Sequence, residues 1–98
     1  MLQGVVDEPL SVAFGRVRQV AASEGWLLSA GGQPQAPTAP MSFRHGLGSM
    51  APASGLGVQL TALDPHRTQV DVTVWRGPTV VDGYEASRFL QAIGAHPA

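Results

Sequence analysis

The sequence predicts an α+β fold in two layers, an antiparallel sheet of about four strands packed against an N-terminal and a C-terminal helix. Two helical patterns, one near each end of the chain, place their apolar residues along one side only. Between them, two alternating runs joined by a Pro-containing turn predict a hairpin with one apolar face. Two one-sided helices need such a face to cover, so the expected order is α-β-β-β-β-α in a single domain, residues 1–98.

The first helix is expected to begin at Asp7, a suitable N-cap residue. Pro9 then falls in the first turn, where its missing N–H costs little. Spacings of four, three and four residues define one apolar face: Leu10, Phe14, Val17 and Ala21. Gly25 follows as the residue that ends the helix.

Two short strands and two loops are expected next. Residues 26–30 form a short apolar run that fits the first strand. Residues 41–46 are expected to form the second, with Phe43 inward and Arg44 outward. The Gly/Pro-rich stretches 31–40 and 46–57 are expected to be flexible loops. Gly57 is a candidate for a β-bulge.

The hairpin carries the clearest strand signal, with one apolar row on each strand: Val58, Leu60 and Ala62 on the first, Val70, Val72 and Val74 on the second. Pairing Leu60 with Val72 keeps both rows on one face. That register leaves Pro65, His66 and Arg67 as a three-residue loop, in which Arg67 takes a positive φ.

The second helix is predicted from a capping-box spacing, with Asp82 as N-cap and Glu85 three residues later. Gly94 closes it, and residues 94–98 are expected to be a frayed tail. Its apolar positions are Tyr84, Ala86, Phe89, Leu90 and Ile93.

Charge and composition exclude several classes of function. The 98 residues carry a formal net charge of −1, and the six basic residues, all Arg, are scattered, so no basic field favours nucleic acid or an acidic membrane. There is no Cys, and the N-terminus lacks the pattern of a signal peptide. We therefore expect a soluble, cytoplasmic protein that binds neither nucleic acid nor membrane.

No catalytic, cofactor or metal site is predicted. The two Gly-Leu-Gly triplets, 46–48 and 55–57, resemble a phosphate-binding loop, but a strand rather than a helix N-terminus follows the second triplet. His45 lies near Ser42 and Ser49, with Asp82 as a possible acid, yet no nucleophile-elbow motif is present. His66 and His96 are expected to be solvated, and the histidines lack metal-ligand spacing.

A tryptophan on the polar face of the hairpin is the most informative single residue of the sequence. Trp75 shares its row with Asp71 and Thr73, and Leu63 joins that face from the other strand. An indole there is either covered by its own chain, for which the Pro-rich loop is the obvious candidate, or contacts a partner.

Two functions are compatible with these features. One is a non-enzymatic interaction module that acts by self-association, as a homo-oligomer, or through a protein partner. The alternative is a domain that holds a small apolar ligand between sheet and helices. The sequence favours the core as the simpler role of the lining residues: Phe14, Val17, Phe43, Leu60, Val72 and Phe89.

The C-terminal half also resembles a small, uncharacterised bacterial α+β domain family, in which an alternating strand is followed by a short apolar segment, an Asp and a final helix. The matching positions are Thr68, Val70, Val72, Thr79, Val80, Val81, Asp82 and Gly83. This chain lacks the Trp that precedes the Gly in that family. The resemblance implies the fold and a bacterial source, and it implies no particular activity.

Overall fold

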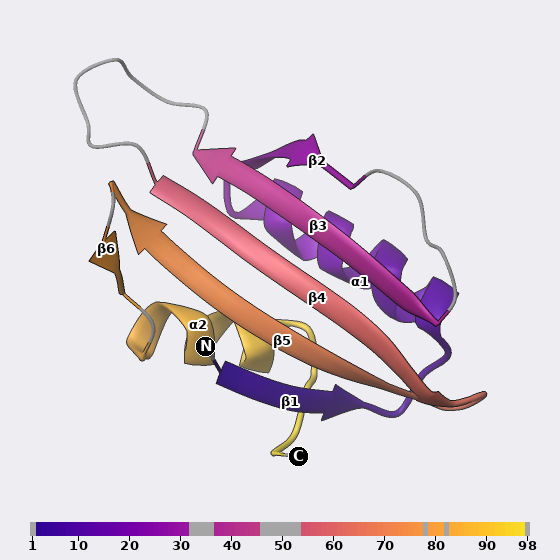
Figure 1. The fold of residues 1–98 in the computed structure, drawn as a ribbon. Helices are drawn as coiled ribbons and strands as arrows, with labels where there is room; N and C mark the ends of the chain where they lie inside the picture. The colour runs from indigo at the N-terminus through magenta and orange to yellow at the C-terminus, as the bar shows by residue number, and fades with distance from the viewer. Residues whose placement is uncertain (1, 32–36, 46–53, 78, 82, 98) are drawn as a thin grey trace.

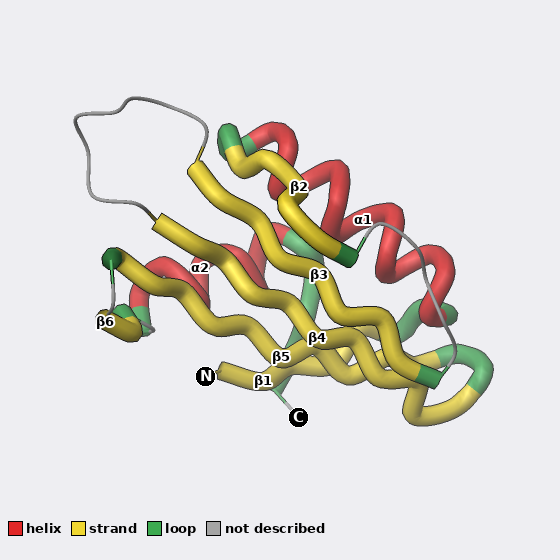
Figure 2. Tube along the Cα trace, turned by 45° about the horizontal axis from the view of Figure 1, so that its top comes forward, coloured by secondary structure: helices red, strands yellow, loops and turns green. Residues whose placement is uncertain are grey.

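The computed structural model describes residues 2–31, 37–45, 54–77, 79–81 and 83–97. In this part of the chain an antiparallel sheet of six strands is covered on one face by two helices (Figures 1 and 2). The predicted α+β class is confirmed. The predicted strand number and order are not, because the observed order is β-α-β-β-β-β-β-α.

The helices are α1 (Leu10–Ser23) and α2 (Tyr84–Ala92). The strands are β1 (Leu2–Val6), β2 (Trp26–Ala30), β3 (Thr38–His45), β4 (Ser54–Asp64), β5 (Arg67–Arg76) and β6 (Thr79–Val80). They are arranged in the order β1-β5-β4-β3-β2, and β6 pairs with the end of β5. The strand β1 was missed because its five residues show no clear alternation, and its pairing partner, β5, is far along the chain.

Parts of both stretches predicted to be loops belong to strands. Residues 38–40 belong to β3 and residues 54–57 belong to β4, while 32–36 and 46–53 lie outside the described residues. Pro40 fits in β3 because β2 pairs no farther along that strand than Ser42, so Pro40 has a neighbouring strand on one side only. The predicted strand 26–30 is confirmed, and the strand predicted at 41–46 corresponds to β3, which ends at His45, with Phe43 buried and Arg44 exposed. Residue 46 lies outside the described residues.

The hairpin has the predicted faces but a different register. Leu60 pairs with Val70 rather than Val72, a shift of two residues, which preserves the face of every side chain. The irregularity lies between Ala62 and Asp64, and the chain turns through Pro65 and His66. Arg67 begins β5, and among the described residues every positive φ belongs to glycine, so the predicted φ of Arg67 is wrong.

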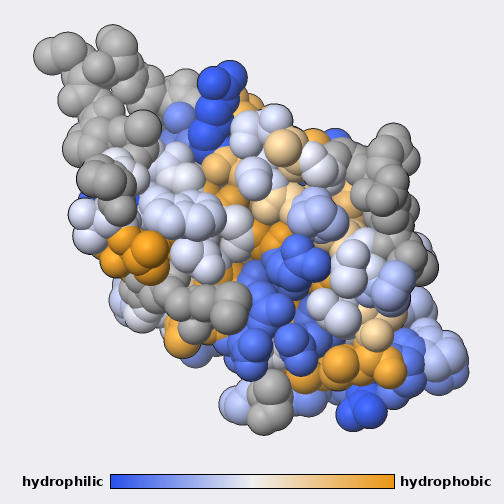
Figure 3. Space-filling model, in the orientation of Figure 1, coloured by the Kyte–Doolittle hydropathy of each residue, from blue (hydrophilic) through white to orange (hydrophobic). Residues whose placement is uncertain are grey.

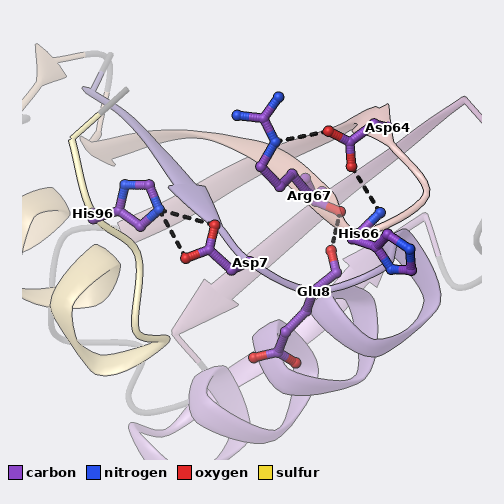
Figure 4. Close-up of polar contacts among 7 residues, drawn as sticks. Asp7, Glu8, Asp64, His66, Arg67 and His96 are labelled. Carbon is purple, nitrogen blue, oxygen red and sulfur yellow. Dashed lines mark hydrogen bonds and ion pairs between the residues drawn. The ribbon is translucent and has the colours of Figure 1, made fainter.

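Asp64 explains this turn. One carboxylate oxygen accepts the His66 backbone N–H at 2.8 Å, and the other accepts Nε of Arg67 at 2.7 Å (Figure 4). The hydrogen bond from the Arg67 side chain and, to a lesser extent, the one from the His66 N–H hold the pKa of Asp64 below its ordinary value. These two hydrogen bonds tighten the turn, so Arg67 enters the strand.

The core lies between the sheet and the helices. The helix-facing rows of β4 and β5 are buried, and α1 and α2 pack on them through Phe14, Val17 and Phe89. The six residues proposed for an apolar ligand are all buried members of this core, none more than 6% exposed: Phe14, Val17, Phe43, Leu60, Val72 and Phe89.

The helix ends differ partly from the prediction. Pro9, not Asp7, is at the N-cap of α1, and Gly83 is at the N-cap of α2; neither helix has a side-chain cap among the described residues. The predicted cap Asp82 lies outside the described residues. Gly25 and Gly94 follow the two helices with φ near +87° and +79°, as predicted. Tyr84, predicted to be apolar core, is 78% exposed.

The C-terminal residues are not a frayed tail. The backbone of His96 forms two hydrogen bonds with that of Val5 in β1, of 2.8 and 2.9 Å. The His96 imidazole Nε2 lies 3.2 Å from the Asp7 carboxylate (Figure 4). Residues near the C-terminus therefore continue the sheet at the β1 edge. In the described part of the chain, neither helix has the length and apolar character needed to cross a membrane.

Candidate functional site

The sheet face opposite the helices carries a shallow groove around Trp75. The groove has a volume of about 240 Å³ and is lined from three strands, among others by Pro40, Gln59, Asp71, Thr73 and Trp75. Hydrophilic side chains gather near the middle of this face, with apolar atoms beside them (Figure 3). The structure thus brings Trp75, Asp71 and Thr73 together on one face.

Leu63 is separated from this group. It lies in the irregular stretch of β4 next to the turn, whereas Trp75 pairs with Gly55 at the opposite end of that strand. Leu63 is 45% exposed. A shared face does not make two side chains neighbours, and the predicted turn at residues 65–67 already implied that Leu63 lies beside it and Trp75 far from it.

Two glycines of β4 make room for the Trp75 indole. A Cβ atom at Gly57 would lie 2.7 Å from Cη2 and 3.0 Å from Cζ3 of the indole, and one at Gly55 would lie 3.1 Å from Cε3. Gly57 pairs regularly with Ser42 and Thr73, so the predicted bulge at this position is wrong. Trp75 is half-buried on its own strands. Of the Pro-rich stretch 31–40, the candidate to cover it, residues 32–36 lie outside the described residues.

Opposite charges lie on this face of the sheet, Asp71 in the lining of the groove and Arg44 outside that lining. Arg44 is in the Trp75–Gly55 row of the sheet, on β3, and Asp71 lies beyond Thr73 on the same face of β5. The Gln69 side-chain amide donates to both Asp71 oxygens at 3.3 and 3.4 Å. No acidic side chain of the described residues forms an ion pair with Arg44.

A second, larger pocket lies at the end of the two layers. Its volume is about 370 Å³, and it is bounded by the end of α1, the start of α2 and the neighbouring ends of β2 to β5. Its lining residues come from six elements or their termini: Glu24, Trp26, His45, Ser54, Arg76, Tyr84, Glu85 and Arg88.

Ion pairs and aromatic rings organise this end pocket. Arg76 donates from Nη2 to Oε1 of Glu85 at 2.6 Å, while Nη2 of Arg88 lies 3.6 Å from Oε1 of Glu24. Trp26 and His45 occupy paired positions on β2 and β3. Their ring centroids are 5.0 Å apart, and the rings are nearly perpendicular, at 82°.

This pocket was not predicted from the sequence, because the charged residues that line it are scattered along the chain. One signal could have indicated it. Arg76 ends a strand and Arg88 lies in the helix that follows, and because that helix must return across the sheet, the two arginines could be expected to lie near each other. Ser42 and His45 do not form the considered Ser/His pair, because Ser42 lies on the outer face and His45 is three residues farther along the strand, in the helix-facing row. Ser49 and Asp82 lie outside the described residues, and those described contain no metal-binding cluster of His, Asp and Glu.

A third hollow, of about 230 Å³, lies between β1, α2 and the C-terminal residues. Leu2, Leu90 and Ala95 contribute much of its lining, and His96 is its only ionisable side chain among the described residues. Gln3, Ser87 and Gln91 complete its polar lining.

Comparison with protein-family models and with curated proteins finds no match for this chain. The resemblance to a bacterial domain family therefore remains a prediction.

Proposed function

We propose that this protein is a non-enzymatic interaction module and that the Trp75 face of its sheet binds a second copy of the chain. The observation that carries this proposal is the half-buried indole of Trp75, seated over Gly55 and Gly57 on a face that neither helix covers. A large aromatic side chain is a frequent anchor of protein interfaces, and with only two side-chain dihedrals it loses little entropy on binding.

The surroundings of Trp75 favour a reversible interface. Ser42, Gln59 and Thr73 provide a polar rim around one aromatic anchor, the usual composition of interfaces whose subunits are also stable alone. A purely apolar face would favour an obligate dimer instead.

Charge supports a second copy as the partner. A two-fold axis places the same surface on both sides of the interface, so a face with both Arg44 and Asp71 can pair each charge with the opposite charge of the other copy. Such an arrangement would form each pair twice, and it would disfavour partners that present a single sign of charge.

Sedimentation velocity over a range of concentrations tests the proposal. The wild-type chain should shift towards a dimer as the concentration rises, and Trp75→Ala should weaken this association by about tenfold or more. Val12→Ala is the matched control, because Val12 is 48% exposed on α1 and away from the sheet face.

Charge reversal then tests the pairing. Arg44→Asp alone should weaken the dimer, and Arg44→Asp combined with Asp71→Arg should restore it. A mass that stays monomeric at every concentration would overturn the proposal. An unchanged dimer in Trp75→Ala would place the interface elsewhere and overturn it as well.

An apolar ligand between the layers is the second candidate, although its six lining residues pack against one another in the core. Native mass spectrometry of the purified protein separates the two: a bound apolar molecule would support this candidate, and a bare chain would count against it.

A further inference from the structure

The end pocket is independent of the Trp75 face, and its side chains point to a ligand of defined chemistry. We propose that it binds a small aromatic monocarboxylate, with the carboxylate on Arg88 and the aromatic ring against Trp26 and His45. The volume of about 370 Å³ falls within the usual range for small-molecule sites, about 300–1,000 Å³.

Arg88 is the cation best placed to receive an anion. Its distance of 3.6 Å to Glu24 exceeds a hydrogen bond, and its side chain is 58% exposed on the pocket wall. A guanidinium has five N–H donors in a fork that matches a carboxylate, so Arg88 can bind one without first losing a short hydrogen bond to Glu24. Arg76, by contrast, already donates to Glu85 at 2.6 Å.

The start of α2 adds a second preference for negative charge. Tyr84 and Glu85, in its first turn, line the pocket, and the N-cap residue Gly83 has no side chain with which to cap the helix. The backbone N–H groups of a first helical turn and the helix dipole favour an anion. The two arginines and this helix end therefore converge on one space.

The aromatic side chains favour a planar ligand. Trp26 is half-buried and its ring is held nearly perpendicular to that of His45, so the two rings form a corner in the pocket. Offset or edge-to-face contact with a third ring stabilises an aromatic ligand beyond the area that it buries.

The two glutamates limit the charge of the ligand. Glu24 and Glu85 line the same pocket as the arginines, so the four formal charges cancel. A dianionic phosphate would meet both carboxylates, whereas a monocarboxylate brings half that charge and matches the planar guanidinium fork. The pocket thus favours a singly charged acid.

Benzoate is a suitable probe, and Trp75→Phe leaves Trp26 as the only tryptophan of the chain. In this variant benzoate should quench the Trp26 fluorescence saturably. Benzyl alcohol, its uncharged analogue, and inorganic phosphate should each bind at least about tenfold more weakly. Calorimetry on the wild-type chain provides the same comparison without the substitution.

Arg88→Gln should weaken benzoate binding at least about tenfold. Arg88→Gln combined with Glu24→Gln should show the same loss, which separates a lost carboxylate contact from simple repulsion by an unpaired Glu24. Arg18→Gln, on the exposed side of α1, should bind like the parent protein.

Three results would overturn the proposal: no saturable response to benzoate, equal binding of benzyl alcohol, or recovery of benzoate binding in the double variant. Phosphate binding as tight as that of benzoate would overturn the aromatic part of it. Because fluorescence and calorimetry detect binding in monomer and dimer alike, a failure of self-association would not be mistaken for a failure of this site.

Discussion

At the scale of single residues, the fit between Gly57 and Trp75 predicts a stability effect. In Gly57→Ala the new methyl group would overlap the tip of the indole, 2.7 Å from its nearest atom. Because Trp75 is half-buried, its ring can swing outward, and we expect a loss of about 1 kcal/mol, at the low end for overpacking. Urea denaturation measures this loss. In a Trp75→Ala background the same substitution should be neutral or stabilising; an equal loss in both backgrounds would exclude the indole as its cause.

The pair of His96 and Asp7 predicts a pH dependence. The hydrogen bond to Asp7, with a smaller contribution from the Pro97 carbonyl, raises the pKa of His96 above its usual 6.5. A raised pKa means that the folded state binds the proton more tightly, so the stabilisation is present below about pH 6.5 and is lost as the pH rises through the folded-state value.

Thermal melts of the wild-type chain and Asp7→Asn test this dependence. The difference in Tm should be present at about pH 5.5 and absent at about pH 8.5. The pKa of His96, followed by NMR, should fall towards 6.5 in Asp7→Asn. Glu85→Gln, near the other end of the sheet, should leave it unchanged. A Tm difference that is the same at both pH values would contradict the assignment.

At the scale of elements, the backbone conformation at the end of β2 requires a glycine. Gly31 has a φ of +82°, and a Cβ atom there would overlap the backbone carbonyl of Pro40. Gly77 also has a positive φ, +58°, but open space around it. The positive φ alone costs an alanine about 1–2 kcal/mol at either position.

Gly31→Ala should therefore destabilise the fold by about 2 kcal/mol more than Gly77→Ala, because backbone atoms cannot move aside as a flexible side chain can. Chemical denaturation of the two variants measures the difference. Equal losses would mean that β2 and β3 adjust to the added methyl group without strain.

At the scale of the whole molecule, the strand order predicts a gradient of protection. The central strands β4 and β5 have neighbours on both sides, whereas β2 is an edge strand and β6 is a two-residue extension with both residues exposed. Amide hydrogen exchange in dilute solution should be slowest in the middle of β5, around Val70 and Val72, and fastest in β2 and β6. Protection of β2 equal to that of β5 would indicate that something covers this edge.

Part of the fold could be predicted from local pattern alone. Helical spacing identified the buried face of α1 through Phe14 and Val17, and alternation identified the buried rows of β4 and β5. Gly25 and Gly94 marked the helix ends. Each of these signals is local, because it depends on residues a few positions apart in the chain.

The candidate sites were predicted only in part. Trp75 was recognised as unusual because an indole interrupted a polar row. The end pocket was not recognised, since Glu24, His45 and Arg88 are far apart in sequence and no local pattern links them.

The sequence by itself therefore determined the two helices, the hairpin and the apolar side of each, since these follow from periodicity. Only the tertiary structure decided which segments lie next to one another. It added β1 to the edge of the sheet and set the hairpin register through the hydrogen bonds of Asp64. It also placed Trp75 over Gly57 and brought Arg76 and Arg88 to one pocket. The physical reason is that these features depend on pairing and packing between distant segments, whose free energy exists only once the chain has folded.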